Sequence, residues 1–465
     1  MAETKSYFFC GIGGSGMLPL ACIVRAQGAE VAGSDRSRDQ ARLGDKFEYL
    51  ERLGIHLFDQ DGSGLTSAGQ ILVTSAAVEE TIPDVQAARR LGAAHLTRPQ
   101  LLAELFNEAP LSIGVAGTSG KSTVTGMIGW ILHEAGKDPT VMNGAVMKNF
   151  VTPDTPFASA LAGRGEAFVS EVDESDGSIA LYSPRIAVLN NISHDHKSMD
   201  ELRGLFAEFL DKAGTAIVNV DDAEMRALAE GVDPSRLVTV SIDGADAQLA
   251  ATGIAEEPLA VAFTLTAKAT GESIPVRLQV PGRHNVANAV AALAAASAAG
   301  VPFRQGAEAL SRFTGLRRRF DIVGVRDGIT VIDDFGHNPD KIAATLATLH
   351  AFPGRLLLFF QPHGFGPLRT LRGGFVSCFS EAMKTDDVLL MCKPAFFGGT
   401  VQETVTSGDV ISEIAANGRT AEYISERADC GRRLAELARP GDRIVIMGAR
   451  DDTLSVFARE VLESL

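Results

Sequence analysis

A glycine-rich turn between an apolar run and a helix-like segment is the part of the chain best suited to chemistry. The turn consists of Gly117, Thr118, Ser119, Gly120, Lys121 and Ser122. Backbone N–H groups at the start of a helix, together with the Lys121 ammonium, would attract phosphate oxygens. The Ser122 hydroxyl could bind a Mg²⁺ ion that bridges those oxygens. The alternative is an ordinary glycine turn, because Val115 occupies the place of the first glycine of G-x-x-x-x-G-K-[ST].

Acidic and imidazole side chains follow two later apolar runs. The run from 168 to 174 ends at Glu174, and the run from 186 to 190 is followed by Asp195 and His196. In an open parallel sheet, strand ends meet at the same edge as the phosphate turn. Ser122, Glu174 and His196 are therefore the predicted ligands of Mg²⁺ or Mn²⁺. For Glu174 or His196 taken alone, the alternative is a solvated side chain at the end of a strand.

A second glycine turn follows the first predicted strand, residues 7–10. It comprises Gly11, Ile12, Gly13, Gly14, Ser15 and Gly16. The turn has the form G-x-G-x-x-G, and Asp35 follows a second strand at about the distance expected for an acidic partner of a ribose. Alone, the motif would suggest NAD. The same turn binds any pyrophosphate, including that of a nucleotide sugar.

An alanine-rich helix is predicted to begin near Pro281 and to reach Ala299. Asn285 and Asn288 could offer their amides to a purine edge, or they could cap the helix. A basic cluster, residues 317–319, closes this segment, either as a surface cluster or facing a phosphate.

The alternation of apolar strands and helices predicts an α/β protein with three doubly wound domains. A Rossmann-like domain is expected over residues 1–108, a P-loop-type central domain over 109–320, and a second Rossmann-like domain over 321–465. The first boundary follows the polar, proline-terminated stretch 107–110. In the third domain, the strand from 329 to 332 is followed by Asp333 and Asp334.

Composition limits the class of protein. The 465 residues carry 43 Lys and Arg against 58 Asp and Glu, a net charge of −15, which argues against nucleic acid as the main partner. The five cysteines have no C-x-x-C spacing, as expected for buried thiols in a reducing compartment. The apolar stretch 7–24 is interrupted by glycines and lacks a cationic lead, so neither an export signal nor a membrane span is expected. A cytoplasmic location is the resulting expectation.

Taken together, these motifs resemble one family, the Mur ligases, over nearly the whole chain. The resemblance is carried, in order, by residues 11–17, 117–122, 173–178, 195–196, 219–222 and 281–285, by Gly315 with residues 318–320, and by residues 333–334 with 336–337. It is closest to the alanine-adding members.

The resemblance implies an ATP-dependent ligase in which the carboxylate of UDP-N-acetylmuramate is phosphorylated by ATP, and an amine such as L-alanine then displaces the phosphate. It implies ATP and Mg²⁺ as cofactors and small molecules as the only partners. The oligomeric state stays open between a monomer and a homodimer. Lys121, Glu174 and His196 would serve catalysis. Besides the phosphate turn, the ATP site would include His284, Asn285, Asn288, Arg319 and Asp334. Besides the first glycine turn, the UDP-sugar site would include Asp35, Ser75 and Arg98. The amino-acid site would include Phe335, His337, His363 and Arg369.

The predicted amino-acid site departs from the family pattern. The family carries arginines where Gly364 and Pro367 stand, and a tyrosine where Phe335 stands. Neither glycine nor proline can form a bidentate ion pair with a carboxylate. Arg369 remains, and Lys393 or Arg450 could compensate. Two further hypotheses stay open: a ligase of this architecture that adds a preformed peptide or uses another carboxylate, and a nicotinamide-dependent protein.

Overall fold

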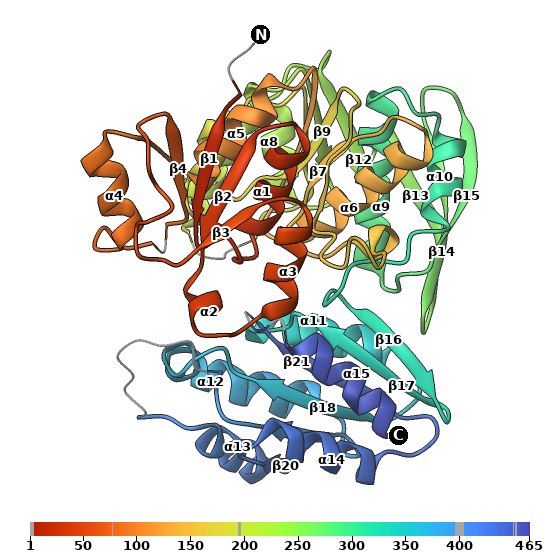
Figure 1. Ribbon diagram of the computed structural model, residues 1–465. Helices are drawn as coiled ribbons and strands as arrows, with labels where there is room; N and C mark the ends of the chain where they lie inside the picture. The colour runs from red at the N-terminus through yellow and green to blue at the C-terminus, as the bar shows by residue number, and fades with distance from the viewer. Residues whose placement is uncertain (1–3, 77, 194–196, 396–403, 450, 452) are drawn as a thin grey trace. The chain divides into compact units, whose positions relative to one another are not determined.

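The computed structural model describes residues 4–76, 78–193, 197–395, 404–449, 451 and 453–465. Its strands form sheets of five, ten and six strands, one within each predicted domain (Figure 1). Contacts divide the chain into two compact units: Met1–Ala255 with Val261–Gln279 and Arg283–Thr314, and Glu256–Ala260 with Val280–Gly282 and Gly315–Leu465. The predicted α/β fold is thus confirmed, while the three domain boundaries remain predictions.

The N-terminal sheet is parallel, with strand order β3-β2-β1-β4-β5. Its strands are β1 (Ser6–Cys10), β2 (Glu30–Ser34), β3 (His56–Phe58), β4 (Gln70–Thr74) and β5 (Ala94–Thr97). Its helices are α1 (Met17–Ala26), α2 (Arg36–Asp39), α3 (Gly44–Arg52), α4 (Pro83–Leu91) and α5 (Arg98–Glu108). Side chains alternate across a strand, so Phe8 and Phe9 enter cores on opposite faces of β1. A sheet buried on both faces explains the continuous apolar run of β1.

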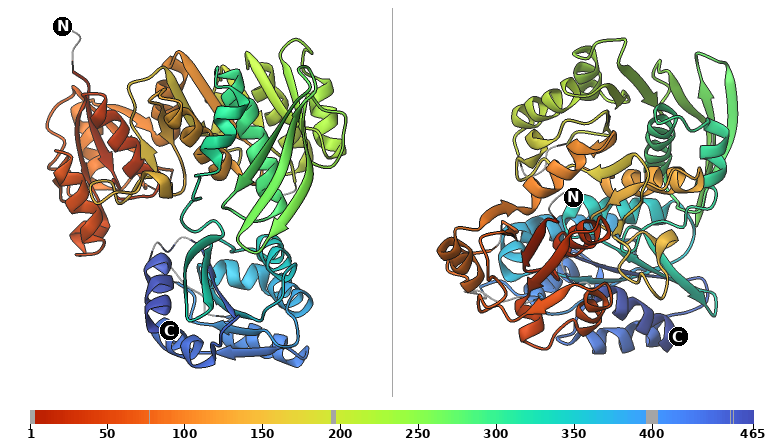
Figure 2. Two further views of the ribbon diagram at one scale, coloured as in Figure 1. Left: turned by 90° about the vertical axis from the view of Figure 1, so that its right-hand side faces the viewer. Right: turned by 45° about the horizontal axis from the view of Figure 1, so that its top comes forward.

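The central sheet has the order β15-β14-β13-β12-β11-β10-β6-β9-β7-β8. The strands around the phosphate turn are β6 (Leu111–Ala116), β9 (Ala167–Glu171), β10 (Ile186–Leu189), β11 (Thr215–Asn219) and β12 (Leu237–Ser241). β7 (Thr140–Met142) pairs with the short β8 (Ala160–Leu161), and β13 (Leu249–Glu257), β14 (Ala260–Ala267) and β15 (Glu272–Leu278) extend the other edge, drawn in green in Figure 2. β14 and β15 pair in antiparallel fashion as a hairpin.

Helices flank the central sheet. They are α6 (Lys121–Glu134), α7 (Met199–Asp211), α8 (Ala223–Glu230), α9 (Arg283–Ala298) and α10 (Phe303–Leu310), with the short 3₁₀ helices η1 (Lys148–Phe150) and η2 (Ser178–Leu181). α9 is buried along nearly its whole length and packs on α6. Its alanines allow this close approach, because a methyl group adds little width to a helix.

The C-terminal sheet has the order β16-β17-β21-β18-β19-β20, and only β16 runs antiparallel to its neighbour. Its strands are β16 (Asp321–Arg326), β17 (Ile329–Asp334), β18 (Leu356–Gln361), β19 (Val388–Met391), β20 (Thr420–Tyr423) and β21 (Arg443–Gly448). Residues of α11 (Pro339–His350), α12 (Phe365–Ala382) and α13 (Ser407–Ala416) share one core, and residues of α14 (Arg427–Leu437) and α15 (Leu454–Ser464) share the other. No helix among the described residues is long and apolar enough to cross a membrane.

Candidate active site

The phosphate turn lies where β6 ends and α6 begins. Gly117 and Gly120 have φ angles of 127° and 81°, a region that side chains with a Cβ rarely adopt. Asn191, which follows β10, holds the turn from the side: its Oδ1 accepts from Ser119 N at 2.9 Å, and its Nδ2 donates to Ser119 O at 2.9 Å. The turn is therefore fixed with the first backbone N–H groups of α6 unused by a capping side chain, as anion binding requires.

Lys121 is engaged by protein groups in this structure. Its Nζ donates to Gly117 O at 2.8 Å and to Glu174 Oε2 at 2.9 Å. The two charged side chains are 17% and 6% exposed, so the ion pair is largely shielded from water. Burial raises the pKa of Glu174, while the Lys121 ammonium acts in the opposite direction. A phosphate that binds Lys121 must therefore compete with this carboxylate.

The carboxylate beside Ser122 is Glu171, the last residue of β9. Ser122 Oγ donates to Glu171 Oε2 at 3.0 Å, and the backbone N–H of Gly144 donates to Oε1. The predicted strand ran on to Glu174, whereas β9 ends at Glu171 and the chain then turns. Glu174 consequently pairs with Lys121, and its predicted metal role stays a prediction. The hydroxyl and carboxylate oxygens of Ser122 and Glu171 are the donor set that fits Mg²⁺.

The third predicted metal ligand, His196, lies outside the described residues, as does Asp195. Within the described part of the chain, no group of three or more His, Cys, Asp or Glu side chains is placed to hold a metal ion. A cation at Ser122 and Glu171 would thus need water or phosphate oxygens to complete its ligands, as Mg²⁺ usually does.

The N-terminal glycine turn is held by the Asp35 carboxylate through backbone N–H groups. Asp35 Oδ2 accepts from Gly13 N at 2.8 Å, and Oδ1 accepts from Ser37 N at 2.7 Å, so the carboxylate caps α2. The residue is 8% exposed. Both oxygens serve the backbone, and the geometry does not favour the expected contact between Asp35 and a ribose.

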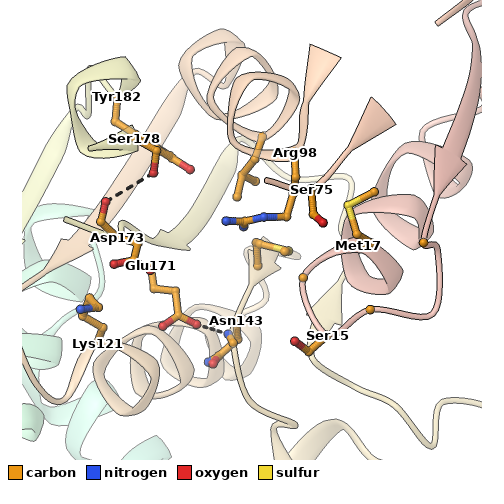
Figure 3. A pocket seen from close by; sticks show the side chains of 16 residues that line it. Ser15, Met17, Ser75, Arg98, Lys121, Asn143, Glu171, Asp173, Ser178 and Tyr182 are labelled. Atoms are coloured by element: carbon orange, nitrogen blue, oxygen red, sulfur yellow. Dashed lines mark hydrogen bonds between the residues drawn. The ribbon is translucent and has the colours of Figure 1, made fainter. Parts of the chain in front are cut away.

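A pocket of about 420 Å³ connects the two glycine turns (Figure 3). Ser15 and Met17 lie at one side of the view, and Lys121 with Asp173 lies at the other. Of the predicted UDP-sugar residues, those that line the pocket are Gly11, Gly14, Ser15, Gly16, Ser75 and Arg98. Ile12, Gly13 and Asp35 are not among its lining residues; Ile12 is fully buried. The pocket thus brings most of the first glycine turn together with Ser75 and Arg98, and the contacts of all these residues with a nucleotide sugar stay predictions.

Arg98 reaches the pocket because of how α5 begins. Thr97 and Gln100 form a capping box, and Pro99 lies in the first turn. The helix therefore begins directly after β5 ends. A Cβ at Gly16 would lie 3.0 Å from Arg98 Cδ, so a larger residue there would press on the arginine side chain. The Arg98 guanidinium is 4.0 Å from Asp176. It supplies a positive charge beside the N-terminal turn.

The two asparagines predicted to face adenine belong to a buried chain of amides. Asn190 Nδ2 donates to Asn288 Oδ1 at 2.8 Å, and Asn288 Nδ2 donates to Asn285 Oδ1 at 3.0 Å. A Cβ at Gly120 would lie 2.6 Å from Asn288 Oδ1. Asn288 therefore packs against the phosphate turn, and its direct contact with adenine stays a prediction. His284 is exposed on the first turn of α9.

In the C-terminal unit, Asp334 binds backbone groups and a hydroxyl. Its Oδ1 accepts from Phe320 N at 2.8 Å, and its Oδ2 accepts from Gly336 N at 3.1 Å and from Thr345 Oγ1 at 2.8 Å. The carboxylate thus fixes the loop after β17. Its predicted contact with a ribose is not favoured by this geometry.

Aromatic and cationic groups gather at the ends of β17 and β18. The guanidinium carbons of Arg318 and Arg319 lie 5.0 and 4.8 Å from the centre of the Phe335 ring. His337 packs edge-on against Phe335 and His363, with ring centres 5.2 and 5.5 Å away.

The His337 imidazole is neutral near pH 7. Burial lowers its pKa to about 4, although the hydrogen bond to Phe335 O acts in the opposite direction. A carbonyl can only accept, so Nδ1 carries the proton in the 2.9 Å bond to Phe335 O. Phe335, His337 and His363 thus form one cluster, while Arg369 is exposed on α12. Lys393 pairs with Glu426 at 2.8 Å, and Arg450 lies outside the described residues.

Comparison with known proteins follows the same division of the chain. Family models match residues 6–109 (Mur ligase family, catalytic domain), 115–296 (Mur ligase middle domain) and 318–450 (Mur ligase, glutamate ligase domain). A UDP-N-acetylmuramate–L-alanine ligase of Paracoccus denitrificans is 35% identical over 100% of this chain and 97% of that protein. The chain belongs to the Mur ligase family. It is an enzyme of the ligase class, and the nicotinamide hypothesis is set aside.

Other Mur ligases resemble this one along nearly its full length. The enzyme of the same name from Cereibacter sphaeroides is 36% identical over 99% of this chain and 96% of its own. The solved structure of the Thermotoga maritima UDP-N-acetylmuramate–alanine ligase has a TM-score of 0.78, 22% identity and 98% coverage of both chains. A murein peptide ligase from Psychrobacter arcticus has a TM-score of 0.70 and 25% identity, covering 99% of this chain and 98% of its own.

Three residues of this Mur ligase's site were missed by the sequence analysis. Glu171 was read as an internal strand residue, and Asn190 and Asn191 as the end of a strand. The signal was available in each case, since polar residues at the carboxyl ends of β9 and β10 flank the turn that follows β6. The sequence does not reveal which of several acids after one strand turns toward Ser122.

Proposed function

We propose that this Mur ligase joins an amino acid to the carboxylate of UDP-N-acetylmuramate at the expense of ATP. The proposal rests on one pocket that both groups of residues line. The N-terminal glycine turn and Arg98 bound it at one side, and Lys121 and Glu171 bound it at the other. A nucleotide sugar with its diphosphate at the first turn would extend toward the phosphate turn. The names of the full-length relatives support the same substrates.

The chemistry follows from the groups at that end of the pocket. The substrate carboxylate attacks the γ-phosphorus of ATP, giving an acyl phosphate and ADP; the amine then attacks the acyl carbon, and inorganic phosphate leaves. Both steps need neutralisation of negative charge more than covalent help. Lys121 would leave Glu174 and bind the γ-phosphate as charge develops. Mg²⁺ bound at Ser122 and Glu171 would neutralise the phosphate oxygens.

The amine would be received at the cluster of Phe335, His337 and His363. A neutral His337 with its proton on Nδ1 offers the Nε2 lone pair as a hydrogen-bond acceptor for an amine. This acceptor can orient an N–H group of the amine, which must lose its ammonium proton before it attacks the acyl carbon. His337 would orient the amine, since an imidazole with so low a pKa is a weak proton acceptor.

A second candidate is a ligase that adds a preformed peptide. Two observations favour keeping it: the fold also matches a murein peptide ligase, and the segment 363–369 has Gly364 and Pro367 before the exposed Arg369. A peptide presents an amide where a free amino acid presents its carboxylate, so no cation is needed at that position.

A panel of amines tests both candidates. The protein, with ATP, Mg²⁺ and UDP-N-acetylmuramate, should release phosphate with at least one of L-alanine, glycine, L-serine or the tripeptide L-alanyl-γ-D-glutamyl-meso-diaminopimelate, and mass spectrometry should find the amide. Product with a single amino acid supports the first candidate, and product with the tripeptide alone supports the second. No phosphate release with any amine would contradict both.

A further inference from the structure

Tyr182 forms part of the pocket wall through a side chain that the fold holds firmly. It directly follows η2, is 2% exposed and lines the pocket. Its ring packs edge-on against Phe106 of α5, with centres 5.2 Å apart. The apolar part of the side chain therefore belongs to the core between η2 and α5.

The backbone on both sides of Tyr182 is also fixed to α5. Asn107 Nδ2 donates to Leu181 O at 2.8 Å, and Asn107 Oδ1 accepts from Ser183 N at 2.9 Å. One amide thus clamps the residues before and after Tyr182. With the ring and the backbone both held, the position of the hydroxyl does not depend on a ligand.

The hydroxyl itself is left without a protein partner. No hydrogen bond joins it to any described residue, although the side chain is almost completely buried. Burial raises the pKa of Tyr182 above its ordinary value, against the influence of Arg98, so the O–H group stays protonated. The hydroxyl lies at the surface of the pocket, where a ligand can reach it, and phenylalanine would pack against Phe106 equally well.

Figure 3 shows Ser178 and Tyr182 on the side of the pocket near Asp173, away from Ser15 and Met17 of the N-terminal turn. A nucleotide sugar whose diphosphate binds that turn reaches this wall only with the part beyond the diphosphate. We propose that the Tyr182 hydroxyl hydrogen-bonds the sugar of the nucleotide-sugar substrate and so selects for the sugar. This inference rests on the proposed function and assigns the contact to one atom.

The test compares two ligands in Tyr182→Phe. Calorimetric titration should show that UDP-N-acetylmuramate binds the variant about fivefold to tenfold more weakly than it binds the wild type, the effect of one hydrogen bond. Affinity for UDP should change less than about twofold, because UDP lacks the N-acetylmuramate group that would contact the hydroxyl. Tyr49→Phe is the matched control, since Tyr49 is a buried phenol that packs on Phe157 and does not line the pocket.

The outcomes separate this inference from the proposed function. Equal weakening of UDP and UDP-N-acetylmuramate, or unchanged affinity for both, overturns the role of Tyr182. A wild type that does not bind UDP-N-acetylmuramate overturns the proposed function and this inference together. Thermal unfolding checks the fold: Tyr182→Phe loses no protein hydrogen bond, so its melting temperature should equal or exceed that of the wild type.

Discussion

At the scale of single residues, the candidate site is defined by two carboxylates with different partners. Glu171 faces Ser122, whereas Glu174 neutralises Lys121. Glu171 ends β9 and Glu174 lies three residues later, and both are glutamates, so residue type alone does not separate their roles. What separates them is the end of β9, after which the chain turns and directs the second carboxylate toward the lysine.

Substitutions of Glu171 and Glu174 should change the Mg²⁺ dependence of the activity differently. Glu171→Gln removes the charge beside Ser122, and the Mg²⁺ concentration for half-maximal activity should rise about tenfold to a hundredfold. Glu174→Gln leaves the pair of Ser122 and Glu171 intact, and this concentration should change less than about threefold. Titration of activity with Mg²⁺ at saturating ATP measures both. A larger shift in the Glu174 variant would show that the metal binds there, as the sequence first indicated.

At the scale of elements, much of the fold was predictable because strands and turns carry local signals. β1 and β10 agree with the predicted runs 7–10 and 186–190 to within one residue, and the phosphate turn lies between β6 and α6 as its glycines require. Other predictions cannot be decided from residue type, because one side chain can serve two purposes. Asp35, Asp334 and Asn288 have the types that bind ribose or adenine, but each is committed to backbone or amide groups whose positions depend on distant segments.

The glycines at the two ends of α6 give a matched pair of variants. Gly120 and Gly136 have φ angles of 81° and 73°, yet only Gly120 has close neighbours, with Asn288 Oδ1 2.6 Å from a Cβ placed there. Gly120→Ala should raise the KM for ATP at least about tenfold, because the turn and the amide chain must shift. Gly136→Ala should leave this KM unchanged and cost about 1 kcal/mol of unfolding free energy. Similar kinetics for the two variants would contradict the role of the Asn288 contact.

At the scale of the whole molecule, three successive α/β sheets agree with the family models, and the first two belong to one compact unit that contains the entire pocket. The N-terminal glycine turn, predicted to bind the nucleotide sugar, and Lys121 of the phosphate turn therefore line one cavity within that unit. The C-terminal unit carries the predicted amine site. The sequence motifs indicated both glycine turns, but only the folded chain shows that residues of both line one pocket.

The central claim is that the carboxylate of UDP-N-acetylmuramate is phosphorylated before an amine is joined to it. The most direct measurement uses this substrate with ¹⁸O in both carboxylate oxygens, together with ATP, Mg²⁺ and the amine that the panel identifies. Mass spectrometry should find one ¹⁸O in each molecule of released phosphate and the other in the amide product. Phosphate without ¹⁸O would mean that ATP is hydrolysed by water, and would contradict the account.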